Sequence, residues 1–154
     1  APIKDAAGPN DFSHMLAAED WAETNNHFRF LQREKGGYDF ERLANFDALL
    51  ATARKILAPY RETINRLLNV LIPMGTREAE VFATVHAAWN NQIRDVLPTD
   101  DDAIIRAARD DWHPDKQKIP VGEFRDAIRR IREHGLVPDG SAKRVSNRPP
   151  DLFA

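Results

Sequence analysis

The chain has 154 residues, no cysteine and a formal net charge of −2. This length suits about one domain with a single hydrophobic core. The absence of cysteine excludes disulfides, zinc–thiolate sites and cysteine nucleophiles. No apolar run approaches the ~20 residues of a membrane-spanning helix, so we expect no membrane partner and a cytoplasmic location.

The two ends of the chain differ from its middle. Residues 1–14 show little hydrophobic periodicity and end in Ser13-His14, which resembles a cloning junction, so we expect a disordered or vector-derived leader. Residues 15–140 carry helical patterns and predict a single helical domain. Residues 141–154 are polar, basic and proline-containing, and predict an extended tail.

The first half of the expected domain predicts several amphipathic helices. One or two helices are expected between Met15 and the glycines near residue 37. Apolar side chains then recur at spacings of three and four, with Asp39 as the expected N-cap and Pro59 as a kink or a new start. The members of this stripe are Leu43, Phe46, Leu50, Ala53 and Leu57, followed by Tyr60, Ile64, Leu67 and Leu71.

The second half predicts a central helix and two shorter ones. Thr76 is expected to cap the central helix, whose apolar residues cover more than one side. These residues are Val81, Phe82, Val85, His86, Ala88, Trp89, Ile93 and Val96. Thr99 opens a second helix that runs to about Trp112. A last helix is expected over residues 121–134, ending in a Schellman motif at Gly135.

We find no alternating strand of convincing length in this sequence. The predicted fold class is therefore all-α, a compact bundle of about six helices, with room for a short β wing near residues 136–137.

Known catalytic motifs are absent from the sequence, including the phosphate-binding GxxxxGK[ST] loop. Asp110, Asp111, His113 and Asp115 could be compared with a metal site, but carboxylates are common at a helix end, and we predict no metal and no cofactor. His86 lies on an apolar face, as core histidines do. The chain is thus predicted not to be an enzyme, although it could be an accessory part of one.

The last predicted helix carries a row of basic side chains. Arg125, Arg129 and Arg132 follow i, i+4, i+7 spacing, and Lys143 and Arg144 continue the basic character into the tail. Arginines in such a row can bind phosphates, so these five are candidate nucleic-acid-binding residues. The alternative is a solvated face that forms weak ion pairs with carboxylates on its own helix.

The sequence His113-Pro114-Asp115, followed by Lys116, resembles the signature loop of J-domain co-chaperones. That resemblance implies a partner loop for a chaperone. The preceding helix, however, is expected to be short and acidic at both ends, which weakens contact with an acidic partner. A local explanation is a simple turn, in which Pro114 stops the helix and Asp115 accepts backbone hydrogen bonds.

A longer stretch, "EVFATVHAAWNNQI" followed by "DDWHPDKQKIPVGEF" and "EHGLVPDG", lies within residues 80–140. It resembles a C-terminal region of subunits of bacterial type I restriction–modification systems. The resemblance implies an accessory module that docks a larger subunit or the remainder of a longer polypeptide. Its basic helix would then lie near DNA phosphates.

Overall fold

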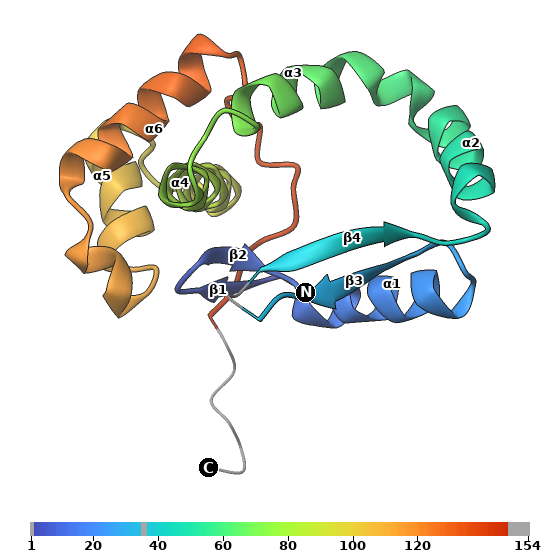
Figure 1. Cartoon of the computed structure of the whole chain (residues 1–154). Helices are drawn as coiled ribbons and strands as arrows, with labels where there is room; N and C mark the ends of the chain where they lie inside the picture. The colour runs from blue at the N-terminus through green and yellow to red at the C-terminus, as the bar shows by residue number, and fades with distance from the viewer. Residues whose placement is uncertain (1, 35–36, 148–154) are drawn as a thin grey trace. The chain divides into compact units, whose positions relative to one another are not determined.

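The computed structural model describes residues 2–34 and 37–147 and contains both helices and strands (Figure 1). Two antiparallel two-stranded sheets accompany the helices, so the predicted all-α class is wrong. Within the described residues, all strands lie between residues 3 and 42. The short β wing considered near residues 136–137 is therefore not formed. Residues 148–154 of the predicted tail lie outside the described part.

The described chain divides into two compact units where one helical domain was expected over residues 15–140. Phe12–Asn65 forms the first, which we call the insert unit. The described residues on either side of it form the second, the core unit. Helix α3, Arg61–Leu71, spans the second boundary between the units in sequence: it begins in the insert unit and ends in the core unit.

Helix α4, Thr76–Arg94, is the centre of the core unit, as predicted. It contacts helix α6 (Val121–Glu133), helix α5 (Asp101–Ile105), the π-helical turn η2 (Arg106–Asp110) and strand β2 (Gly8–Asn10). Its buried apolar residues are Val81, Phe82, Val85, Ala87, Ala88 and Trp89.

Two details at the ends of α4 differ from expectation. Gly75 is the N-cap residue in place of Thr76, and the Glu78 carboxylate accepts a hydrogen bond from the Gly75 N–H at 3.1 Å. The helix stops before Val96, which has a φ of 55° and is 92% exposed. The helical periodicity that assigned Val96 to the buried face therefore does not extend beyond Arg94.

The ends of the neighbouring helices follow ordinary capping chemistry. Asp100, one residue after the predicted cap, accepts a hydrogen bond from the Ala103 N–H at 3.0 Å and starts α5. At the end of α6, the Leu136 N–H donates to the Ile131 carbonyl at 2.9 Å, and Gly135 has a φ of 62°. This is the predicted Schellman ending.

Strands β1 (Ile3–Asp5) and β2 (Gly8–Asn10) form a hairpin in the segment expected to be a disordered or vector-derived leader. Residues that are distant in sequence hold this hairpin in place. Ile3 forms a parallel bridge with Ser146, and the Trp112 indole N–H donates to the Asp5 carbonyl at 3.1 Å. Strands of three residues are too short to produce a visible alternation in the sequence.

The insert unit holds a second hairpin where helix was expected. Helix α1 spans Phe12–Thr24. Asn26, two residues beyond its end, has a φ of 55° and lets the His27 N–H donate to the Ala22 carbonyl at 2.8 Å. The remaining elements are strand β3 (Phe28–Gln32), strand β4 (Tyr38–Arg42), helix α2 (Phe46–Leu57) and the 3₁₀ turn η1 (Ala58–Tyr60). Asp39, the expected helix cap, lies within β4, and Pro59 lies in the turn that separates α2 from α3.

The two units differ sharply in burial. The core unit has one continuous cluster of buried apolar residues centred on α4. In the insert unit, Ala22 alone is buried among the described residues, and α2 has no buried residue. The amphipathic stripe of α2 is therefore present in the sequence, but the structure does not cover it.

Replacing Trp89 with Ala should lower the free energy of unfolding by about 3–5 kcal/mol, because a buried aromatic ring leaves a cavity when it is removed. Trp89 is 6% exposed, and the guanidinium of Arg132 lies 5.3 Å from its ring centroid. Urea denaturation followed by circular dichroism measures the change. An unfolding curve equal to that of the wild type would place Trp89 outside the core. Trp21→Ala is the matched control, since this tryptophan is 51% exposed.

Candidate functional site

A cluster of aromatic rings lies on one face of the β3–β4 hairpin. Phe30 and Phe40 are cross-strand partners with ring centroids 5.8 Å apart, and Phe28 lies 5.3 Å from Phe40. Tyr38 lies 6.4 Å from Phe30, and Phe46 of α2 lies 5.7 Å from Phe40. Phe30, Tyr38 and Phe40 are 44%, 64% and 49% exposed. The aromatic cluster is thus packed against itself and open to solvent.

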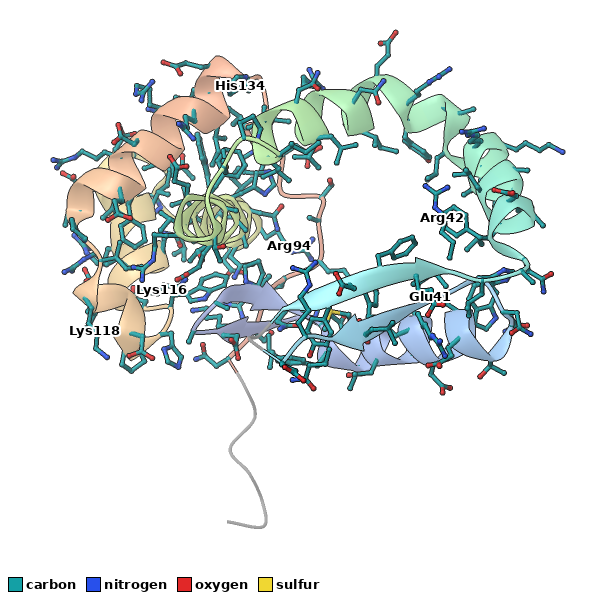
Figure 2. The ribbon with its side chains drawn as sticks, in the orientation of Figure 1. Glu41, Arg42, Arg94, Lys116, Lys118 and His134 are labelled. Carbon is teal, nitrogen blue, oxygen red and sulfur yellow. The ribbon has the colours of Figure 1, made fainter. Side chains whose placement is uncertain are left out.

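The other face of this hairpin is mainly polar, with Leu31 as its apolar residue. Arg29 donates to the Glu41 carboxylate at 2.6 Å, and Arg33 pairs with Asp39. Because side chains alternate along a strand, this separation is the expected amphipathic pattern of a two-faced hairpin. Arg42 is on the aromatic side, with its guanidinium 4.8 Å from the Phe46 ring centroid, and Figure 2 shows it between the hairpin and α2.

A groove lies where α2, η1 and the start of α3 meet. Its volume is about 270 Å³. Leu50, Ala53, Arg54, Leu57, Ala58, Arg61, Ile64 and Asn65 line this α2–α3 groove. Leu57 is 45% exposed there. Since Phe46 and Leu50 are one helical turn apart on α2, the aromatic cluster and the groove form one apolar surface, which we call the apolar face.

The predicted arginine row of α6 is brought together, but each side chain already has a carboxylate partner. Arg125 lies 3.5 Å from Asp102. Arg129 binds Glu133 at 2.9 Å, and this bond, together with Asp126, raises its pKa above the usual value. Arg132 binds a carboxylate of α5 at 2.6 Å. A phosphate would therefore have to compete with carboxylates for each of these guanidinium groups.

The candidate residues of the tail are held in a similar way. Arg144 binds Asp95 at 2.9 Å, and this hydrogen bond lowers the pKa of Asp95. The neighbouring Val145 is fixed by Asn91, whose amide donates to the Val145 carbonyl at 2.8 Å and accepts from its N–H at 3.1 Å. Lys143 is exposed and has no carboxylate of the described residues within ion-pair distance. Within the described part of the tail, Lys143 is thus the cation left for contact with a nucleic acid.

The His113-Pro114-Asp115 loop forms a short 3₁₀ turn, η3, over Pro114–Lys118. The His113 ring nitrogen Nδ1 accepts a hydrogen bond from the Asp115 N–H at 3.2 Å, so histidine caps the turn in the way expected of Asp115. The Asp115 carboxylate binds Lys118, which lowers its pKa. The three loop residues are therefore engaged in building their own turn.

Lys116 anchors this loop to α4. Its side chain is completely buried, and its ammonium group donates to the Glu80 carboxylate at 2.6 Å. Glu80 is 19% exposed and also lies 3.7 Å from Arg77. In Figure 2, Lys116 lies beside α4, whereas Lys118 is at the outer surface of the loop, where it is 79% exposed. The loop is thus fixed by an ion pair that is largely removed from water.

The remaining candidate chemistry is not assembled into a site. Within residues 2–34 and 37–147, no group of three or more His, Asp or Glu residues could hold a metal ion. Asp110 binds Arg109 at 2.6 Å. His86 is half-buried, and desolvation lowers its pKa, which favours the neutral ring of a core histidine. No helix in the described residues is long and apolar enough to cross a membrane.

No family model, curated protein or solved structure matches this chain. Its function must therefore be inferred from the apolar face, the paired arginines and the anchored loop.

Two features of the site escaped the sequence analysis. The alternation of aromatic and polar residues at Phe28-Arg29-Phe30 and again at Tyr38-Asp39-Phe40 could have indicated the hairpin. The ion pair between Lys116 and Glu80 had no signal, because the two residues are 36 positions apart and each also fits an exposed position. The apolar stripe from Phe46 to Leu57, by contrast, lies on helix α2 as predicted, whereas Leu43 of the predicted stripe precedes the helix.

Replacing Lys116 with Met should destabilise the protein by up to about 3 kcal/mol, because the Glu80 carboxylate would lose its closest cation in a poorly hydrated position. Lys118→Met is the matched control, since its ion pair is exposed, and its melting temperature should stay near that of the wild type. Thermal unfolding of both variants tests this. Equal melting temperatures for the two would show that Lys116 does not anchor the loop.

Changing Arg125, Arg129 and Arg132 together to Gln should leave duplex DNA binding unaltered, because these side chains already bind carboxylates. The measurement is a fluorescence titration of labelled duplex DNA at several salt concentrations. Each lost phosphate contact would reduce the slope of log K against log salt by about 0.9. A slope that flattens by roughly two to three units would establish the phosphate role predicted from the sequence.

Proposed function

We propose that this chain is a non-catalytic interaction module of a larger DNA-processing assembly of the restriction–modification type, and that it docks a partner protein through its apolar face. The observation that carries this proposal is the burial of the insert unit. Ala22 alone is buried among its described residues, although the unit contains helices α1 and α2 and strands β3 and β4, and α2 carries a clear apolar stripe.

Folding energetics support a missing partner. Ordering a backbone costs about 1–2 kcal/mol per residue, and burial of apolar surface is the main term that offsets this cost. An insert unit with one buried residue gains little free energy from the burial of apolar surface. Contiguous exposed apolar surface of this kind commonly marks a protein-interaction site. A partner that covers the aromatic cluster and the groove would supply the burial that the unit lacks.

The assembly type in the proposal comes from the sequence resemblance over residues 80–140, and the docking role comes from the geometry. No catalytic set is needed for docking. A chaperone-type role for His113, Pro114 and Asp115 has less support, because these residues hold the η3 turn together and Lys116 is buried. Phosphate binding by α6 is not part of the proposal, since its arginines are paired.

The test is co-expression of the full chain with the products of its neighbouring genes, followed by size-exclusion chromatography. We expect one of these products to co-elute with the wild type. Leu57→Asp should abolish co-elution, because it places a charge in the α2–α3 groove. Ile72→Asp is the matched control, because Ile72 is 76% exposed and does not line the groove, so this variant should still co-elute.

Circular dichroism and the melting temperature establish that Leu57→Asp remains folded. Since Leu57 is 45% exposed in the chain alone, the substitution should change the melting temperature little. The proposal fails if no neighbouring product co-elutes with the wild type, or if Leu57→Asp co-elutes as the wild type does.

A further inference from the structure

We propose that the partner segment in the α2–α3 groove is an amphipathic helix whose apolar stripe is flanked by carboxylates. This inference rests on the proposed docking function and adds the chemistry of the partner. It follows from two properties of the groove, its apolar floor and its two unpaired arginines.

The floor of the groove suits apolar side chains on a helix. Leu50, Ala53 and Leu57 come from α2, Ala58 comes from η1, and Ile64 comes from α3. A surface between two helices, with alanines that leave room between larger side chains, accepts side chains spaced at i, i+3, i+4 and i+7. A phosphate backbone is a poor occupant, because it would lie against these aliphatic groups.

Arg54 and Arg61 give the groove its charge. Both line it, and neither has a carboxylate of the described residues within ion-pair distance. Helical spacing explains why. The residues three and four positions from Arg54 are Leu50, Ala51, Leu57 and Ala58, and those around Arg61 are Leu57, Ala58, Ile64 and Asn65. No acidic side chain is therefore placed to neutralise either arginine from its own helix.

The contrast with α6 makes this arrangement informative. There, Arg125, Arg129 and Arg132 each bind a carboxylate. The groove also has arginines beside its apolar floor, but these arginines have no carboxylate partner among the described residues. Charges at the rim of an interface select partners of opposite sign and fix their register. Acidic side chains beside the apolar stripe of a docked helix would complete both ion pairs.

The experiment measures binding of two designed peptides to the full-length chain by fluorescence anisotropy. Both peptides have about 18 residues, which form five helical turns, and carry the same leucine stripe. One has Glu at the flanking positions and the other has Lys. We expect the Glu peptide to bind roughly tenfold more tightly at low salt, with the difference falling as salt screens the pairs. Equal affinities, a preference for the Lys peptide, or binding of neither peptide would overturn the inference.

Charge reversal in the chain supplies the second measurement. Changing Arg54 and Arg61 together to Glu should invert the preference, so that the Lys peptide binds more tightly. Lys55→Glu is the matched control, because Lys55 is an exposed cation of the same helix that does not line the groove, and it should keep the preference of the wild type. An unchanged preference in the double variant would also overturn the inference, provided that circular dichroism shows the wild-type helix content.

The outcome separates this inference from the proposed function. If the chain prefers neither the Glu peptide nor the Lys peptide, but Leu57→Asp still abolishes co-elution with a neighbouring gene product, the apolar face docks a partner that lacks flanking carboxylates. If Leu57→Asp has no effect on co-elution, the docking function itself has failed.

Discussion

Helix α4 is the element on which the core unit depends. Six of its residues belong to the buried apolar cluster, and its polar side chains contact three other segments. Glu80 binds the buried Lys116 of the η3 turn, Asn91 holds the backbone of Val145, and Thr84 lies next to Gly8 of the first hairpin. Loss of α4 would therefore release the loop, the tail and the hairpin together, since none of these short segments has enough local contacts to order itself.

The core unit also has few charged or titratable side chains available for function. The arginines of α6 and Arg144 of the tail bind carboxylates, and the ring of His113 caps a turn. Side chains that look functional in the sequence are thus occupied with internal contacts. The insert unit shows the opposite situation. Helical spacing places its apolar stripes and the two groove arginines on one surface, but nothing in the described unit covers them.

The sequence predicted the parts of the fold that depend on local chemistry. The helical period located α4 and α6 to within a few residues, and Gly135 located the end of α6, because both signals act within a few residues. The first hairpin was missed because its strands have only three residues each. The second was missed because its alternation of aromatic and polar residues and the Asn26 turn after α1 were not recognised. In the candidate site, too, local patterns were predictable and contacts between distant residues were not. The α2 stripe was visible, whereas the pairing of Arg132 with Asp101, 31 residues away, was not.

An insert unit without its own core has a thermodynamic consequence for docking. A partner that binds the ordered form adds stability by mass action, and part of its binding free energy is used to restrict the unit's conformations. Affinity would then be lower than the covered apolar area suggests. The well-buried core unit does not share this dependence, because its contacts with α4 are complete without a partner. Selectivity for the partner would come from the rim, where Arg54 and Arg61 favour carboxylates at two fixed positions, while the apolar floor accepts many hydrophobic side chains.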